Sequence, residues 1–194
     1  MDVTLFQNLP TFGPALDGLE VAEVIAALGG GMEDVAPDLP AQVVSTGSPF
    51  LFVPVTSRRV VDDAPRDLAA IADLSQRHGA LGVYVFAVEE TAEAAGATKT
   101  WGRCFAPTAG LNEDPVTGSA SGALGGYLAR HGRLRFTPSL EEGREVARFV
   151  AQQGFAGGRG GAARIEIGRR AGKAAHIAVT GSAVLVAEGT FRLR

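Results

Sequence analysis

The stretch Gly110-Leu-Asn-Glu-Asp-Pro-Val-Thr-Gly-Ser-Ala-Ser-Gly-Ala-Leu-Gly-Gly-Tyr-Leu-Ala-Arg130 decides how the rest of the chain is interpreted. Two adjacent carboxylates, Glu113 and Asp114, and a proline precede Thr117, a residue type that often starts helices. Four side chains then recur on one helical face, at Ala120, Leu124, Tyr127 and Leu128. The pattern predicts a turn followed by a helix that ends at His131-Gly132.

The start of this predicted helix is the candidate binding site. The N–H groups of a first helical turn have no partner within the helix, and the helix dipole favours an anion there. Gly118 and Ser119, next to Thr117, are small enough for a carboxylate to approach the backbone. Asp114, just upstream, is placed to accept or donate a proton. The alternative is a self-capped helix after an Asp-Pro turn, with Glu113 and Asp114 in solvent.

Three glycines inside the predicted helix need a separate explanation. Gly122, Gly125 and Gly126 each destabilise a helix by about 1 kcal/mol relative to alanine. Their presence indicates close contact with a sheet, another helix or a ligand. We therefore expect most of the helix to be buried within a wrapped sheet and its first turn to face solvent or a cleft.

Composition excludes several classes of protein. The chain has 194 residues, 46% of them hydrophobic and 20% charged, which is enough to bury a core. No basic run interleaved with aromatic residues appears, so a nucleic-acid partner is not expected. The single cysteine, Cys104, excludes an intrachain disulfide, and the three histidines lack zinc-ligand spacing. Without a long apolar run or a signal-peptide core, we expect a cytoplasmic protein and no membrane partner.

The remaining elements favour an α+β fold. Helices are predicted at 19–28, 65–77 and 140–152, the last from the helical spacing of Val146, Phe149 and Val150. The run Phe50–Val55 is apolar at every position, which is typical of a strand buried on both faces. Further strands are expected at 3–6, 42–46, 82–88, 100–105, 163–167, 176–180, 183–187 and 190–193. Antiparallel hairpins late in the chain favour α+β over a doubly wound parallel sheet.

The order of these motifs resembles one known family. The central motif and its context resemble the phenazine-biosynthesis isomerase (PhzF-like) family at Phe105-Ala-Pro, Gly110, Glu113-Asp-Pro-Val-Thr-Gly-Ser-Ala120, Thr46-Gly-Ser-Pro49 and Gln153-Gly154. The resemblance implies a diaminopimelate-epimerase-like fold, with a mixed, mainly antiparallel sheet wrapped around a central helix in each of two halves. It also implies cofactor-free acid/base isomerisation of a small carboxylate in the cleft between the halves. By this resemblance Asp114 is catalytic, and Gly118 and Ser119, with Thr117, hold the substrate carboxylate.

One departure from the family shapes our expectations about assembly. The family's first half carries a catalytic glutamate in a Ser-Glu-Thr-like motif and a Gly-His-Ala helix start, and neither occurs here. The chain therefore resembles the family's C-terminal half. We expect residues 1–39 to be a remnant of the first half, 40–180 the C-terminal domain, and 181–194 terminal strands that complete the first half or an interface.

A half-domain of this kind is expected to need a partner. We expect either a separate first-half chain or a homodimer, with contacts through the first 30 residues or the final strands. The argument assumes that Val21, Val24 and Ile25 form an uncovered helix face, and their burial against the chain's own sheet would contradict it. A degenerate, non-catalytic subunit that binds a small carboxylate or serves only as a partner is the alternative function.

Overall fold

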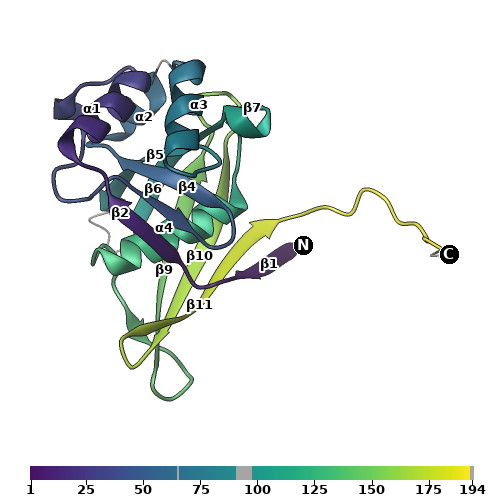
Figure 1. Cartoon of the computed structure of the whole chain (residues 1–194). Coiled ribbons are helices and arrows are strands. Elements are labelled where there is room, and N and C mark those ends of the chain that lie inside the picture. Colours follow the sequence, from purple (N-terminus) through teal and green to yellow (C-terminus); the bar gives the residue numbers. More distant parts are fainter. Residues whose placement is uncertain (65, 91–97, 193–194) are drawn as a thin grey trace.

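The computed structural model describes residues 1–64, 66–90 and 98–192, and Figure 1 shows that one curled sheet surrounds the helix α4. Within these residues the helices are α1 (Gly18–Ala27), α2 (Arg58–Asp63), α3 (Leu68–Arg77) and α4 (Gly118–Arg130), with short 3-10 turns η1 (Met32–Asp34) and η2 (Pro107–Ala109). The strands are β1 (Asp2–Gln7), β2 (Thr11–Ala15), β3 (Gln42–Ser45), β4 (Pro49–Pro54), β5 (Val83–Glu90), β6 (Thr98–Ala106), β7 (Leu111–Asp114), β8 (Thr137–Pro138), β9 (Arg144–Gln153), β10 (Gly161–Arg170) and β11 (Lys173–Ser182).

The sheet is mixed and mainly antiparallel, as predicted. Its strand order is β1-β11-β10-β9-β6-β5-β4-β3-β2, with β7 attached to β6 and β8 to β9. Two pairs are parallel, β4 with β5 and β6 with β9, and the others are antiparallel. The two end strands, β1 and β2, are joined by residues 8–10 alone, so the edges of the curled sheet meet at a seam. The predicted α+β class and the wrapped central helix are confirmed.

Strands β4 and β5 are buried on both faces, which explains their continuous apolar sequence. Phe50 and Phe52 of β4 belong to the core cluster around α4. Leu51 and Val53, the alternate residues of β4, belong to a second cluster with apolar residues of α1, α2 and α3. These are Val24, Ile25 and the C-cap Leu28 of α1, Val61 of α2, and Ile71 and Leu74 of α3. Because successive strand residues point to opposite faces, each face needs its own apolar row. The expectation of a two-sided buried strand is confirmed.

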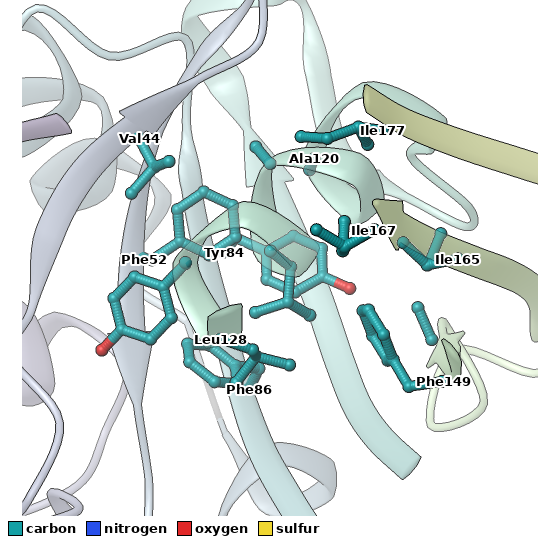
Figure 2. Close-up of a cluster of buried hydrophobic side chains, with 14 of the residues drawn as sticks. Val44, Phe52, Tyr84, Phe86, Ala120, Leu128, Phe149, Ile165, Ile167 and Ile177 are labelled. Carbon is teal, nitrogen blue, oxygen red and sulfur yellow. The ribbon is translucent and has the colours of Figure 1, made fainter. Parts of the chain in front are cut away.

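Aromatic rings of β4 and β5 pack on the second half of α4 (Figure 2). The ring centroid of Tyr127 lies 6.0 Å from that of Phe52 and 5.5 Å from that of Phe86. The Tyr127 hydroxyl donates a 2.7 Å hydrogen bond to the carbonyl of Pro40, so the buried phenol has a partner. Every residue from Ala120 to Leu128 is buried. The prediction of a buried central helix is confirmed.

The three glycines of α4 let the sheet approach the helix backbone. A Cβ at Gly125 would lie 2.6 Å from Ile167 Cδ1, and one at Gly126 would lie 2.6 Å from Pro10 Cγ. A Cβ at Gly122 would lie 2.1 Å from the side-chain oxygen of Gln7. These positions face β10, the β1–β2 connection and β1 respectively. Of the three explanations that the sequence allowed, contact with a sheet is the one observed.

The predicted helix over 140–152 is wrong, because this segment contains β9. Ala147, Phe149, Ala151 and Gln153 are buried on one face of that strand, with exposed Arg148 among the residues between them. This period-two row is inconspicuous in the sequence because two of its members are alanine and one is glutamine. β9 pairs with β10 on one side and β6 on the other, and those two ladders override the helical spacing at 146, 149 and 150.

The expected uncovered face of α1 is also wrong. Val24 and Ile25 are fully buried in the apolar cluster that α1 shares with β4 and β5. Val21, on the same helix, is only 9% exposed. The helix is covered by the chain's own sheet, so α1 gives no argument for a partner chain, and a partner has to be argued from another surface. β2 also pairs with β3, so residues 1–39 contribute to the same sheet as residues 40–180. Whether residues 1–39 descend from a first half stays a prediction.

The expected strands after residue 182 do not form. The last ladder bonds join the backbones of Met1 and Ala183, and β11 ends at Ser182. Described residues 183–192 then leave the body of the fold without secondary structure (Figure 1), because no neighbouring strand is present to pair with them. Val184, Leu185, Val186 and Phe191 are all exposed in this segment. The rest of the strand predicted at 190–193 lies outside the described residues.

The contact between α4 and the β1–β2 connection gives a stability prediction. Gly126→Ala should lower the free energy of unfolding by about 1–3 kcal/mol, because the new methyl overlaps the rigid ring of Pro10, although alanine itself favours a helix. Gly18→Ala in the first turn of α1 is the control, because nothing lies within 4 Å of its new Cβ. Urea unfolding measures both, and a Gly126→Ala protein as stable as the control would contradict this packing.

Candidate active site

The start of α4 is held between the end of β7 and the end of β9. Asp114 is the last residue of β7, and β7 pairs with β6 through Cys104 and Ala106. Pro115 and Val116 then turn the chain into the helix, with Thr117 as the residue before its first turn. In the described part of the chain, no side chain caps the first turn of α4. The first-turn N–H groups therefore remain available to a ligand.

Thr117 points its hydroxyl to Asp114 instead of capping the helix. Thr117 Oγ1 donates a 2.7 Å hydrogen bond to Asp114 Oδ2. The bond fixes the carboxylate beside the start of α4 and occupies one of its two oxygens. Asp114 is half-buried, and Gly118 and Ser119 are half-buried as well, so all three reach the surface together. The sequence-predicted residues Asp114, Thr117, Gly118 and Ser119 are thus brought into one place.

The side chain of Gln153, the last residue of β9, is almost completely buried and holds Thr117 and Asp114 in place. Its side-chain oxygen accepts from the Thr117 N–H at 3.1 Å. Its side-chain nitrogen donates to Thr117 Oγ1 at 3.0 Å and to the Asp114 carbonyl at 2.6 Å. A chain of donors therefore runs from Gln153 through the Thr117 hydroxyl to the Asp114 carboxylate. Sequence reasoning missed this role, because the helix expected at 140–152 concealed that Gln153 ends an inward-facing strand row.

Gln7 of β1 holds the other side of the first turn. Its side-chain nitrogen donates a 2.9 Å hydrogen bond to the carbonyl of Gly118, and its side-chain oxygen accepts from Thr46 Oγ1 at 2.7 Å. The Gln7 side chain also occupies the space that a Cβ at Gly122 would take. Thr46, from the Thr46-Gly-Ser-Pro49 motif, therefore supports the start of α4 through Gln7. The two edges of the sheet meet at this point.

Glu113, the neighbour of Asp114, has a structural role. Arg103 holds both of its carboxylate oxygens, at 2.8 and 3.0 Å, and Arg66 approaches one of them at 3.2 Å. The Arg103 side chain is 5% exposed and also donates to the carbonyls of Val61, Asp62 and Ala64 at the end of α2. Such a bidentate pair fixes the orientation of the carboxylate as well as contributing binding energy. The alternative that placed Glu113 in solvent is wrong.

Space is open above Gly118. A Cβ built there would find only Val179, at 4.0 Å, whereas those at the buried glycines of α4 would overlap the sheet. A ligand could therefore reach the first-turn backbone without displacing a side chain. Ser119, directly after it, lies in the same first turn and is half-buried.

Two further features bear on chemistry and location. Over the described ranges, no group of three histidine, cysteine, aspartate or glutamate side chains is arranged to hold a metal. No helix among those described is both long and apolar enough to cross a bilayer. The expectations of a cytoplasmic location and of no cofactor stay predictions.

Comparison with known proteins identifies the family. The family model described as phenazine biosynthesis-like protein, PhzC-PhzF, matches residues 1–189. The chain belongs to this family. It is 32% identical over 184 residues to the uncharacterized isomerase YddE of Escherichia coli strain K12, a match that covers 95% of this chain and 58% of that protein. The chain thus spans 58% of the length of this relative.

Two further similar proteins are a solved structure and a named enzyme. The crystal structure of the Bacillus anthracis phenazine biosynthesis protein of the PhzF family matches with a TM-score of 0.72 at 23% identity, over 93% of this chain and 57% of that one. This likeness confirms the PhzF-like fold. The trans-2,3-dihydro-3-hydroxyanthranilate isomerase of Pseudomonas chlororaphis is 36% identical over 102 residues, which is 51% of this chain and 33% of that enzyme.

The buried amide of Gln153 gives a prediction with a matched control. Gln153→Leu should lower the free energy of unfolding by about 2 kcal/mol or more, because it leaves the Thr117 N–H and the Asp114 carbonyl without partners. Gln152→Leu changes the half-buried neighbour on the other face of β9 and should have little effect. Urea unfolding of the Gln153→Leu and Gln152→Leu proteins measures both effects. Equal free energies of unfolding would contradict the role of Gln153 in holding the start of α4.

Cys104 gives a chemical prediction. Burial raises the pKa of its thiol to about 12 from an ordinary 9.0, and only the thiolate reacts readily. Near pH 8, iodoacetamide should label the folded protein far more slowly than the urea-unfolded protein. Because the folded pKa is the higher one, this thiol's contribution to stability is complete below about pH 9 and declines as the pH rises toward 12. Rapid labelling of the folded chain would contradict its burial against the site.

Proposed function

We propose that this chain forms one wall of a cofactor-free isomerase active site. In this proposal the first turn of α4 holds a substrate carboxylate at Gly118 and Ser119, and Asp114 transfers the proton. The observation that supports it best is the direction of the Thr117 hydroxyl, which donates to Asp114 and leaves the helix start uncapped. Thr117 thus places the carboxylate of Asp114 next to the uncapped N–H groups of the first turn of α4.

The proposed substrate is a small conjugated carboxylate. First-turn N–H groups and the helix dipole favour an anion, and the space above Gly118 admits one. Asp114 would remove a proton from a carbon near the bound carboxylate, and the proton would return at another carbon of the conjugated system. The name of the Pseudomonas chlororaphis relative supports this choice, because a 2,3-dihydro-3-hydroxyanthranilate is a ring carboxylate with conjugated double bonds.

The proposal requires a second wall. Among the described residues at the start of α4, Asp114 is the carboxylate outside an ion pair, since Glu113 is bound by Arg103 and Arg66. A 1,3 proton shift is easier with a second group that exchanges protons on the far side of the substrate. We propose that a separate first-half chain supplies this group, because Asp114 has no second unpaired carboxylate beside it among the described residues at the start of α4.

The edge at β1 is the proposed contact surface for that partner. Val3, Leu5 and Phe6 of β1 are exposed, as are Val184, Leu185 and Val186 in the segment that follows β11. β1 ends the sheet, so its outer edge carries backbone groups that no strand pairs. Apolar side chains gathered at an open edge favour association with another chain. A homodimer through the same edge is the alternative assembly.

A non-catalytic role is the second candidate. It is favoured because Asp114 is the carboxylate outside an ion pair among the described residues at the start of α4. With no second group to exchange protons, the site would bind a carboxylate but isomerise it weakly or not at all. The partner of the native protein decides between the two. Mass spectrometry of copurifying chains should find a polypeptide with a glutamate and a Gly-His helix start. Recovery of this chain alone would favour the binding role.

Binding at the helix start is tested directly by titration with 2-aminobenzoate. The backbone amide signals of Gly118 and Ser119 should shift, and Ser119→Leu should weaken the affinity by roughly tenfold because it fills the approach to the N–H groups. Asp114→Asn is the control, because it removes a neighbouring negative charge and should bind at least as tightly. The neutral analogue 2-aminobenzamide should not shift these signals. Equal affinity of the Ser119→Leu and unmodified proteins would contradict the proposed site.

A further inference from the structure

A cavity lies between the edges of the sheet, beside the C-terminal half of α4. Its volume is about 200 Å³, and its apolar lining includes Pro10, Gly126, Ile167 and Ile177. Pro10 precedes β2, Gly126 belongs to α4, and the isoleucines belong to β10 and β11. The cavity therefore lies between the start of β2 on one side and β10 and β11 on the other, with α4 beneath them. Gly126 lets Pro10 pack directly on the helix at one wall of this cavity, because a Cβ there would lie 2.6 Å from Pro10 Cγ.

Two arginine–aromatic pairs line the same cavity. The Arg130 guanidinium lies 4.4 Å from the ring centroid of Phe12, and that of Arg169 lies 4.0 Å from the ring centroid of Phe136. The cavity therefore combines apolar walls and ring faces with cationic groups. Such a combination suits a ligand that has an apolar body and a charged end.

The two arginines differ in their charge balance. Arg169 is neutralised by Glu145, which accepts from it at 2.7 and 3.1 Å. Arg130 is exposed and has no carboxylate partner among the described residues. It lies in the last turn of α4, where the helix carbonyls favour a cation, so its position is stabilised without an acidic side chain. Among the described residues, no carboxylate is therefore paired with the Arg130 charge in the cavity lining.

We propose that this cavity is a binding site for a single-ring amphipathic anion, with the ring against Ile167 and Ile177 and the carboxylate on Arg130. A volume of about 200 Å³ is below that of sites for drug-sized ligands and accommodates one ring. The site is separate from the one at the start of α4. Gly118 and Arg130 lie twelve positions apart along α4, and twelve residues of helix span roughly 18 Å.

Benzoate and its neutral analogue benzamide test the charge requirement. Titrations of the whole chain would be followed through the methyl signals of Ile167 and Ile177, which line this cavity. Benzoate should shift both signals and bind roughly tenfold more tightly than benzamide, because its carboxylate pairs with Arg130. Arg130→Gln should abolish that preference. Arg135→Gln removes an exposed charge outside the cavity lining and should retain it.

A second variant separates this site from the proposed active site. Ser119→Leu should leave the benzoate shifts of Ile167 and Ile177 unchanged, even if it removes binding at the start of α4. Loss of those shifts in Ser119→Leu would mean that they report on the other site and would overturn the proposal. Equal affinity for benzoate in the Arg130→Gln and unmodified proteins, with unchanged urea unfolding, would overturn it too.

Discussion

The whole structure depends on the contact between the glycine face of α4 and the sheet that surrounds it. At Gly122, Gly125 and Gly126 the sheet comes so close that a Cβ would overlap Gln7, Ile167 or Pro10. Glycine in a helix is destabilising by about 1 kcal/mol per residue, and burial of the helix on all sides has to offset that loss. Aromatic residues of β4 and β5 provide the burial on the opposite face, where Tyr127 packs on Phe52 and Phe86.

A helix fixed in this way also fixes its first turn. Gln153 reaches the turn from β9 and Gln7 reaches it from β1, so both polar supports are delivered by the wrapped sheet itself. Thr117 can then direct its hydroxyl to Asp114 without loss of order in the helix start. The proposed acid/base group and anion site follow from packing: a helix held by its sides leaves its N-terminal end free for chemistry. Membership of the PhzF-like family is consistent with such use.

Sequence reasoning grouped the candidate-site residues but missed the side chains that support them. Asp114, Thr117, Gly118 and Ser119 are adjacent in the chain, so a local motif sufficed to predict them together. Gln7 and Gln153 are 111 and 36 positions from their partners in the site, and only the strand pairing brings them there. The helix predicted over β9 failed because alanines carry little period-two signal, and the strands predicted after residue 182 failed because they lack neighbours. The exposed face expected on α1 failed because the sequence cannot show which sheet covers a helix.

Native-state hydrogen exchange, with and without 2-aminobenzoate, tests the central claim most directly. The amides of Leu124 to Leu128, buried inside the sheet, should exchange only when the protein unfolds globally. The amides of Gly118 and Ser119, which have no capping side chain, should exchange rapidly in the free protein and become protected by the carboxylate. Rapid exchange within Leu124–Leu128, or protection at Gly118 and Ser119 that the ligand leaves unchanged, would contradict a rigid buried helix with an open, anion-binding first turn.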